Sequence, residues 1–331
     1  MKSILCLNTG SSTIKFDLYR DEQVVDSGQR DSTGELNIDD ILTPLAEQPD
    51  AIAHRVVHGG RKYSDATRID DELCAELQRL IPLAPSHLPR AIAAIEKTLE
   101  HFPGIPQFAC FDTAFHQRMP EIAKRYPFSK ALWEKGVQRF GFHGLSYESI
   151  IESLEDRLPH RLVIAHLGNG CSLCAVRDGM PIDTTMGFTP TGGVMMGTRC
   201  GDLDPGVFLY LMRECNYSAD DLDRLVNHEA GLLGTSGMTS DMRDLLSAAS
   251  THPDAAFAVD LYCYGIRKAI GSLAATLGGL DLLVFTGGIG ENSPEIRNRI
   301  LCGLDFLRCE VEVIPTNESL SMVRQVRKLS L

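Results

Sequence analysis

The fold of this chain follows from its opening stretch, ILCLNTGSSTIKFDLY, which occupies residues 4–19. An apolar run leads into a polar turn with one glycine, and a second run follows the turn. In the second run, Ile14, Phe16 and Leu18 alternate with polar residues, which is the period-2 pattern of a half-buried strand. The stretch therefore predicts a β-hairpin.

The turn of this hairpin carries groups suited to binding an anion. Besides its backbone N–H groups it has the hydroxyls of Ser11 and Ser12, and Lys15 lies just beyond it. Turns of this kind bind phosphate through backbone dipoles. It is not a P-loop, because the glycine–lysine spacing is absent and a strand follows instead of a helix. A purely structural hairpin would have a similar sequence, so both interpretations stay open here.

A second stretch, LVIAHLGNGCSLCAV at residues 162–176, repeats this plan. Three of its positions match the first stretch at a constant offset of 160 residues (167 − 7 = 160): Leu167, Gly170 and Ser172 match Leu7, Gly10 and Ser12. The offset is close to half of the 331 residues, which indicates divergent internal duplication. Two related domains, each with a phosphate-binding hairpin at a shared cleft, are typical of the actin-like and sugar-kinase-like ATPases.

The composition is that of an ordinary globular protein with room for two domains. Hydrophobic residues make up 44% and charged residues 23% of the 331 positions. The net charge of −12, with no basic run to offset it, argues against a nucleic-acid-binding surface. No apolar run is long enough to cross a bilayer, and Met1-Lys2-Ser3 leads into a strand rather than a signal peptide. The sequence thus predicts a cytoplasmic protein without nucleic-acid or membrane partners.

The ten cysteines are too sparse for a disulfide scaffold. Cys171 and Cys174 form the only C-x-x-C pair. In the predicted strand their side chains point to opposite faces, and no second pair completes a zinc site. We therefore expect buried free thiols.

Two further apolar strands carry chemically active residues. Residues 51–58 include Arg55 and two histidines. A buried cation needs a partner, which is either an anionic ligand or an internal carboxylate. Residues 107–111 lead to Asp112 at a strand's carboxyl end, where open α/β sheets bind their ligands.

Glycine-rich segments follow. His143 lies between two glycines, which suits either close approach to a ligand or an ordinary tight turn. Residues 183–206 form a long Gly/Thr/Met segment without hydrophobic period, typical of a functional loop, and Arg199 lies within it. Residues 280–292 predict a buried strand and a glycine turn, which is either a platform for a purine or a generic βα turn.

The remaining pattern predicts mostly helices. A short strand and one helix are expected between residues 20 and 50. Further helices are expected at residues 70–80, 90–99, from 146 onward, and 256–277, and the expected N-caps are Asp204, Ser218, Ser240 and Ser293.

Several of these segments together resemble the acetate kinase family, the acetate/propionate kinases of the actin-like ATPase superfamily. The matching stretches run from end to end in family order: NTGSS (8–12), HRVVHGG (54–60), FDTAFH (111–116), GFHG (141–144), HLGNG (166–170), residues 183–204, FTGGIGENS (285–293) and PTNE (315–318). Each is short, but their combination is specific.

The resemblance implies a mixed α/β fold of two duplicated actin-like, ribonuclease H-like domains around a nucleotide cleft. Domain I would comprise residues 1–114 with 320–331, and domain II, which binds the nucleotide, residues 115–319. The implied reaction is reversible transfer of the γ-phosphoryl group of ATP to acetate, giving acetyl phosphate and ADP. Mg²⁺ is the implied metal, with Mn²⁺ as a substitute, and a homodimer is the implied assembly.

The resemblance also implies roles for individual residues. The catalytic group would be Arg55, Asp112, His143 and Arg199, with Glu318 as a second acid. The metal would be held by Asn8 and Glu318. Acetate would be bound by Arg55, Val57, His87 and Pro190. The implied ATP-binding residues are Ser11, Ser12, Lys15, His166, Gly168, Asn169, Gly170, Gly287, Gly288, Ile289, Gly290 and Asn292.

These residue types suit the implied chemistry. A carboxylate acceptor is already an anionic nucleophile, so no strong base is needed. Repulsion between two anions must be overcome, and two arginines match carboxylate and phosphoryl oxygens well.

The chain is short for this family between Phe16 and Ala51 and between Leu301 and Val311. Two alternatives stay open: a kinase of propionate or another short-chain acid, and a nucleotide-binding scaffold that shares the fold without the activity.

Overall fold

The computed structural model describes residues 3–10, 13–31 and 45–329, which form two compact units. Unit 1 comprises Met1–Arg118, Phe142–Glu152 and Asn317–Leu331, and unit 2 comprises Met119–Gly141 and Ser153–Thr316. The predicted domain II, 115–319, includes the segment Phe142–Glu152 that the structure groups with unit 1. The predicted domain boundaries stay a prediction.

Unit 1 is built on a six-stranded sheet with the order β3-β2-β1-β4-β6-β5. Its strands are β1 (Ser3–Thr9), β2 (Thr13–Arg20), β3 (Gln23–Asp31), β4 (Ala51–Val56), β5 (Thr67–Arg68) and β6 (Gln107–Phe111). β2 is antiparallel to both of its neighbours, β1 and β3, whereas β1, β4 and β6 run parallel. The predicted opening hairpin and the strands after it are confirmed.

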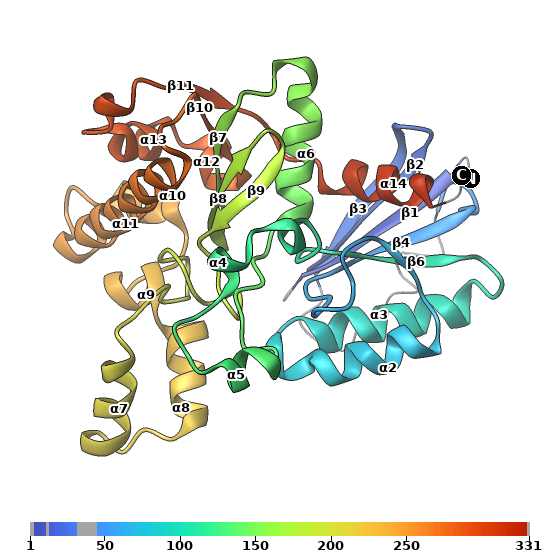
Figure 1. Ribbon diagram of the computed structural model, residues 1–331, viewed down its shortest axis with the longest axis horizontal. Helices are drawn as coiled ribbons and strands as arrows, with labels where there is room; N and C mark the ends of the chain where they lie inside the picture. Colours follow the sequence, from blue (N-terminus) through green and yellow to red (C-terminus); the bar gives the residue numbers. More distant parts are fainter. Residues whose placement is uncertain (1–2, 11–12, 32–44, 330–331) are drawn as a thin grey trace. The chain divides into compact units, whose positions relative to one another are not determined.

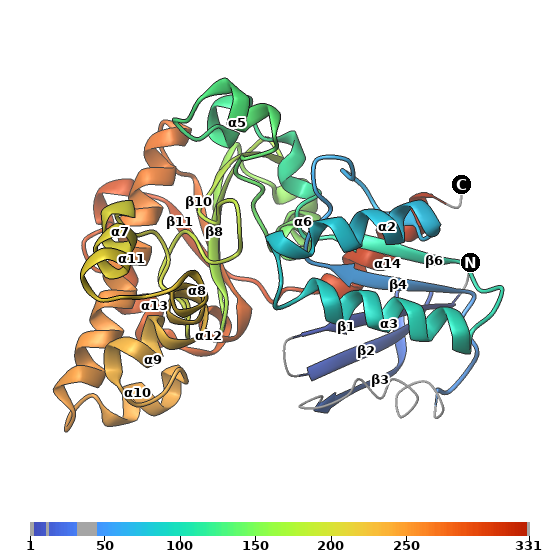
Figure 2. The ribbon, with the colours of Figure 1, turned by 90° about the horizontal axis from the view of Figure 1, so that it is seen from below.

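Helices cover both faces of this sheet. Unit 1 has α2 (Asp71–Leu80), η1 (Ile81–Leu83), α3 (Leu88–His101), η2 (Phe115–Arg118), most of α6 (Gly144–Leu154) and α14 (Glu318–Lys328). The predicted alternation in β2 is real, since Ile14, Phe16 and Leu18 are buried in a cluster that α3 completes. On the opposite face Ile4 and Cys6 pack against α14. Figure 2 shows α2 and α3 running along one face.

Unit 2 has a five-stranded sheet with the order β11-β10-β7-β8-β9 (Figure 1). Its strands are β7 (Arg161–Leu167), β8 (Cys171–Arg177), β9 (Met180–Thr184), β10 (Leu282–Thr286) and β11 (Glu310–Val313). As in unit 1, three antiparallel strands continue into two parallel ones. Apart from the short edge strand β5 of unit 1, the two sheets share one topology, as the predicted duplication requires.

The equivalent first strands lie 158 residues apart (161 − 3 = 158), not 160. The predicted glycine match is therefore two residues out of step with the strands. Because side chains alternate along a strand with a period of two, a shift of two residues keeps the same set of side chains on the buried face of the sheet.

The helices of unit 2 surround its sheet. They are α4 (Glu121–Lys124), α5 (Lys130–Glu134), η3 (Glu155–Arg157), α7 (Pro205–Glu214), α8 (Ala219–Arg224), η4 (Leu225–Glu229), α9 (Gly231–Ser236), α10 (Met242–Ala248), α11 (Pro253–Leu277), α12 (Gly287–Asn292), α13 (Pro294–Leu301) and η5 (Asp305–Leu307). The long α11 packs on β7, β8 and β9 and ends at Gly278 in the left-handed conformation.

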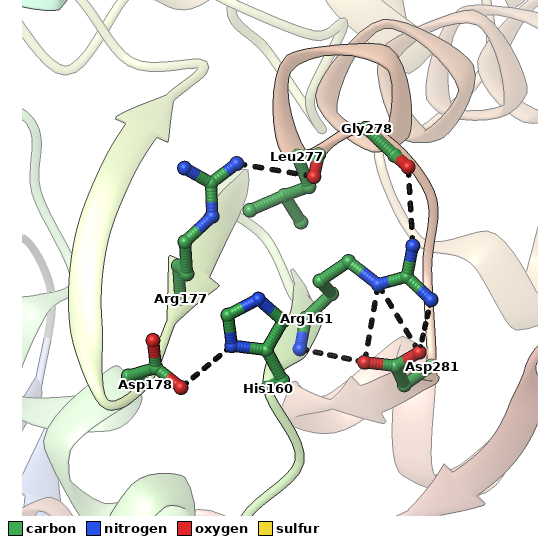
Figure 3. A network of polar contacts seen from close by, with 7 residues as sticks. All are labelled: His160, Arg161, Arg177, Asp178, Leu277, Gly278 and Asp281. Atoms are coloured by element: carbon green, nitrogen blue, oxygen red, sulfur yellow. Dashed lines mark hydrogen bonds and ion pairs between the residues drawn. The ribbon is translucent and has the colours of Figure 1, made fainter.

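Two arginines fasten that end of α11 to the sheet (Figure 3). Arg161 donates to the carbonyl of Gly278 (3.1 Å), and Arg177 donates to the carbonyl of Leu277 (3.0 Å). Arg161 is held in turn by the carboxylate of Asp281, to which its backbone N–H also donates (2.8 Å). The last carbonyls of a helix have no partner within it, so these donors stabilise the helix end.

The structure agrees with two of the predicted helix caps and differs from the prediction in other places. Ser218 and Ser293 cap their helices as predicted, but the cap of α10 is Asp241 and not Ser240, because the Asp241 carboxylate accepts from the backbone N–H of Arg243. The predicted glycine turn after β10 is wound into the short helix α12. The helix expected between residues 20 and 50 coincides with positions outside the described residues, whereas the strand there is β3.

Cys171 and Cys174 are buried and free, as expected. Among the helices that the structure describes, none has the length and apolar character needed to span a membrane.

Candidate active site

Four predicted residues converge in unit 1. Asn8 lies near the carboxyl end of β1, Arg55 lies in β4, and Asp112 directly follows β6. Since these strands run parallel, their carboxyl ends meet at one edge of the sheet. Glu318, the first residue of α14, completes the cluster, which we call the Arg55 cluster.

Arg55 is the centre of this cluster. It makes a bidentate ion pair with Asp112, from Nε to Oδ1 (3.0 Å) and from Nη2 to Oδ2 (2.7 Å). Its Nη1 lies 3.2 Å from Oε2 of Glu318 and donates to Oδ1 of Asn8 (3.3 Å). Asn8 in turn donates from Nδ2 to Oε2 of Glu318 (3.4 Å). The internal ion pair considered as one explanation for a buried arginine is therefore present.

The ionisation of Arg55 reflects these neighbours. Burial by itself lowers the pKa of Arg55, but the carboxylates of Asp112 and Glu318 outweigh it and raise the pKa above its usual range. The side chain remains 19% exposed, so part of the guanidinium is still accessible to a ligand.

His143 is held in a special backbone conformation beside this cluster. Its φ is +58°, in the left-handed region that few non-glycine residues adopt. The next residue, Gly144, donates its N–H to the carbonyl of Asp112 (2.9 Å), and a Cβ there would lie 2.3 Å from that oxygen. Packing against Asp112 thus requires a glycine at position 144, and this contact places His143, which directly precedes α6, beside Asp112. Strain of this kind is concentrated at functional sites.

A buried polar network that the sequence did not reveal supports β4 next to Arg55. His54 shares a hydrogen bond with Oε1 of Gln107 (2.8 Å), and the hydroxyl of Thr98 in α3 donates to the same oxygen (2.9 Å). Burial lowers the pKa of His54 to about 4, and burial lowers the pKa of His58 to about 4 as well. Both rings are neutral at pH 7, so Arg55 is the cation that β4 offers.

The cluster also fits a divalent cation. Asn8 and Glu318 carry amide and carboxylate oxygens, the ligands that Mg²⁺ prefers, and the two side chains are neighbours, with Nδ2 of Asn8 3.4 Å from Oε2 of Glu318. Across residues 3–10, 13–31 and 45–329, no three His, Cys, Asp or Glu side chains are grouped to hold a metal. Mg²⁺ commonly uses one or two protein ligands together with substrate phosphates, so this sparse donor set suits it.

Arg199 has different surroundings in unit 2. It lies in the long loop between β9 and α7, and its Nη1 donates to the carbonyl of Pro190 (2.7 Å). No carboxylate forms an ion pair with Arg199 in the part of the chain that the structure describes. Burial therefore lowers the pKa of Arg199, since no paired carboxylate offsets it. A partly buried guanidinium without an anion is a candidate anion-binding group.

The glycine turns of unit 2 border one cavity of about 770 Å³. The predicted ATP-binding residues among its walls are Gly168, Asn169, Gly288, Ile289 and Asn292. The volume is in the range of small-molecule sites. Part of its wall was not predicted: Asp241, the cap of α10, and Met242 and Arg243 in that helix also line it. The only signal for them was the capping pattern at the start of that helix.

Neighbouring glycines have different roles here. Gly287 has a φ of +77°, and a Cβ on it would meet the backbone of Leu167 at 2.9 Å. A Cβ on Gly288 would meet nothing within 4 Å. Gly287 is therefore required by the fold, whereas Gly288 leaves room in the cavity.

The remaining predicted residues are distributed over both units. Val57 and His87 are half-buried in unit 1, and Pro190 lies in unit 2, so their shared pocket stays a prediction. Lys15 is exposed on β2, and Ser11 and Ser12 lie outside the described residues. His166, Gly170, Gly287 and Gly290 are not among the walls of the cavity.

Known proteins resemble this chain along most of its length. The acetate kinase of Rhodopseudomonas palustris (strain ATCC BAA-98 / CGA009) is 43% identical over 339 residues, covering 90% of this chain and 85% of the relative. The crystal structure of Porphyromonas gingivalis acetate kinase has a TM-score of 0.89 at 31% identity, with 100% of each chain covered. A propionate kinase from Francisella tularensis subsp. tularensis SCHU S4 has a TM-score of 0.89 at 32% identity, covering 98% of this chain and 99% of that one.

More distant structures agree on the fold alone. A ROK family protein from Streptococcus pneumoniae TIGR4 has a TM-score of 0.51 at 12% identity, covering 99% of each chain. The predicted sugar-kinase-like, actin-like fold is confirmed. The model of the acetokinase family matches residues 35–319, and with that match and the relatives above, the chain belongs to the acetokinase family.

Proposed function

We propose that this protein reversibly transfers the γ-phosphoryl group of ATP to acetate, giving acetyl phosphate and ADP. The observation that carries the proposal is the Arg55 cluster, in which one arginine, two carboxylates and an amide converge at the carboxyl edge of a sheet. Membership of the acetokinase family and the acetate kinase relatives support it.

In the proposed reaction an acetate oxygen attacks the γ-phosphorus. The new O–P bond forms as the bond between that phosphorus and the β–γ bridging oxygen breaks, and the electron pair stays on ADP. No proton is transferred, so the protein's task is to orient two anions and offset their charge. Arg55 and Arg199 are proposed to bind the reacting oxygens, and His143 to donate a hydrogen bond to them.

The two acids have separate roles in this proposal. Asp112 holds the guanidinium of Arg55 in one orientation through its bidentate pair. Asn8 and Glu318 would hold Mg²⁺, with Mn²⁺ as a substitute. When bound, the metal supplies positive charge to the phosphate oxygens of the nucleotide.

The nucleotide is proposed to occupy the cavity bordered by Gly168, Asn169, Gly288, Ile289 and Asn292. The open space beside Gly288 supports this placement. Ser11, Ser12, Lys15, His166, Gly170, Gly287 and Gly290 remain predicted contributors to ATP binding.

Acetate is proposed as the preferred acceptor, in a pocket formed by Val57, His87 and Pro190. The propionate kinase from Francisella tularensis keeps a longer acid as an alternative. One methylene group contributes only about 1–3 kcal/mol of discrimination, so a modest preference is expected.

A homodimer is proposed through unit 2. Exposed apolar residues follow one face of α11 at positions i, i+4 and i+7: Phe257, Leu261 and Tyr264. Leu203, just before α7, lines a cavity of about 570 Å³ together with Leu261 and Tyr264, so α11 and the segment leading into α7 share this surface. Light scattering would give twice the chain mass, and Tyr264→Glu would give a monomer. The cytoplasmic location stays a prediction.

The proposed activity is tested by trapping acyl phosphate as its hydroxamate, with ATP, Mg²⁺ and acetate, propionate or butyrate. The highest rate of acyl phosphate formation is expected with acetate, and Glu318→Ala is expected to abolish product formation. Arg161→Ala, which removes the contacts with Gly278 and Asp281 and changes no proposed site residue, is the control for a general loss of stability. A folded protein that binds ATP yet forms no acyl phosphate from any acid would support the scaffold alternative instead.

A further inference from the structure

Glu318 is flanked by two residues that are fastened to the opening hairpin. Asn317 caps α14, and its Oδ1 accepts from a backbone N–H of that helix (3.0 Å) and from the hydroxyl of Tyr19 (3.1 Å). On the other side, Ser319 donates from Oγ to Oδ2 of Asp17 (2.5 Å). Tyr19 and Asp17, the partners in these two hydrogen bonds, both belong to β2.

The backbone around Glu318 is held from two more elements. The N–H of Asn317 donates to Oγ of Ser149 in α6 (2.7 Å), and the carbonyl of Ser319 accepts from Sγ of Cys6 in β1 (3.4 Å). On each side of Glu318, one side-chain hydrogen bond and one backbone hydrogen bond therefore hold the start of α14.

The two β2 residues are placed for this task by strand alternation. Asp17 and Tyr19 lie on the face of β2 opposite Phe16 and Leu18, whose side chains belong to the cluster on the α3 side. Tyr19 is 2% exposed and packs in the cluster that includes α14. A buried hydroxyl is costly without a partner, and Asn317 is the partner that the structure provides.

We propose that Tyr19 and Asp17 are positioning residues that direct the Glu318 carboxylate toward Asn8, and thereby set the affinity of the site for a divalent cation. The proposal rests on the proposed function, in which Asn8 and Glu318 hold Mg²⁺. The direction of a first-turn side chain follows from the backbone at the cap, which Asn317 and Ser319 determine here. Hydrogen bonds behind a metal ligand orient it and tune metal affinity.

Tyr19→Phe removes the hydroxyl and keeps the buried ring. The dissociation constant for Mn²⁺, read from the EPR signal of free Mn²⁺ in the presence of ADP, is expected to rise by about 5- to 10-fold. The free Mg²⁺ concentration that gives half-maximal activity is expected to rise by the same factor. At saturating Mg²⁺, kcat is expected to stay within about twofold of the wild type, since no reacting group has changed.

Two further variants test the hydrogen bond from Ser319 to Asp17. Ser319→Ala removes the donor to Asp17 and is expected to raise the Mn²⁺ dissociation constant similarly. Asp17→Asn retains an oxygen that accepts from Ser319, so it is expected to keep most of the wild-type affinity. Ser319→Ala also serves as the test if Tyr19→Phe fails to fold.

Arg324→Gln is the matched control on the same helix. Arg324 pairs with Glu22 (2.7 Å) and Glu152 (3.2 Å), and thus fastens α14 more than a turn beyond Glu318. We expect this variant to lower the Tm but to leave the Mn²⁺ dissociation constant unchanged.

The inference is overturned if Tyr19→Phe and Ser319→Ala bind Mn²⁺ as the wild type does, or if Arg324→Gln weakens Mn²⁺ binding equally. Absence of acyl phosphate in the wild type would refute the proposed function instead. The Mn²⁺ titration reports on the inference in either case.

Discussion

Arg55 and Arg199 are both predicted catalytic arginines, yet their surroundings differ. Arg55, in unit 1, is neutralised by Asp112 and Glu318, and its pKa is raised by them. Arg199, in unit 2, has a carbonyl as its hydrogen-bond acceptor, and burial lowers its pKa. The protein's own carboxylates offset the charge of Arg55, whereas an anion from outside the protein would be needed to offset the charge of Arg199. Arg55 therefore supports the fold of unit 1 as well as its site, whereas the guanidinium of Arg199 in unit 2 is a candidate group for binding a ligand anion.

The largest expected effect is that of Arg55→Ala, because it removes both functions at once. Loss of an arginine that binds the reacting oxygens is expected to lower kcat by about 10³-fold. The buried carboxylate of Asp112 also loses its counter-charge, which is expected to lower the free energy of unfolding by about 3 kcal/mol. Hydroxamate assays and urea denaturation measure the two effects.

The double variant Arg55→Ala, Asp112→Ala is the control for that prediction. Removing both partners also takes away the buried carboxylate that had lost the arginine, so stability is expected to recover in part while activity does not. A double variant as unstable as Arg55→Ala would contradict the role assigned to the ion pair.

Arg199→Ala is expected to lower kcat by a similar factor of about 10³, but to destabilise the protein less than Arg55→Ala does. No carboxylate in the described residues loses a partner, so only the hydrogen bond to the Pro190 carbonyl is lost, and the free energy of unfolding is expected to fall by about 1 kcal/mol. The same assays apply. A loss of stability equal to that of Arg55→Ala would remove the contrast between the two arginines.

His54 in β4 and His58 just beyond its end make unit 1 sensitive to acid. The pKa of His54 is about 4 in the folded protein and 6.5 when unfolded. As pH falls from 6.5 to 4 only the unfolded state takes up a proton, so stability decreases by about 1.4 kcal/mol per pH unit, about 3 kcal/mol in all. Denaturation at pH 7, 5.5 and 4.5 measures the slope.

His54→Gln removes one titrating group, and it is expected to flatten this pH dependence. His58, whose pKa is also about 4, contributes in the same window and keeps part of the slope in that variant. An unchanged slope would show that His54 is not the group responsible.

The smallest predicted effect concerns the cavity of unit 2. Gly288→Val places a side chain where a Cβ meets nothing within 4 Å, so it is expected to raise the KM for ATP by about tenfold with little change in Tm. The neighbouring Gly287→Ala is the matched control. Its φ of +77° and its contact with Leu167 predict a loss of stability of about 1–2 kcal/mol. Similar effects of the two substitutions would contradict the separate roles.

Much of the fold was accessible from local patterns. The alternation of Ile14, Phe16 and Leu18 predicted β2, and the caps at Ser218 and Ser293 predicted two helix starts. Ser240 was wrong because the adjacent Asp241 is an equally good cap, and only the backbone path determines which of the two precedes the helix.

The candidate site was partly accessible in the same way. Arg55 and Asp112 were indicated by the strand patterns, and Asn8 and Glu318 by the family resemblance, but the convergence of the four appeared only in the structure. Tyr19 and Asp17 were missed, because alternation tells which face they share but not which helix covers it.

Short-range features of the chain were sufficient for the strands, most caps, the duplicated plan and the family, because each depends on residues close together in sequence. Long-range contacts settled the rest. They paired Arg55 but not Arg199 with carboxylates, separated Gly287 from Gly288, and placed β2 behind Glu318. Burial and ion pairing depend on what the folded chain brings together across many positions, and no local pattern contains that information.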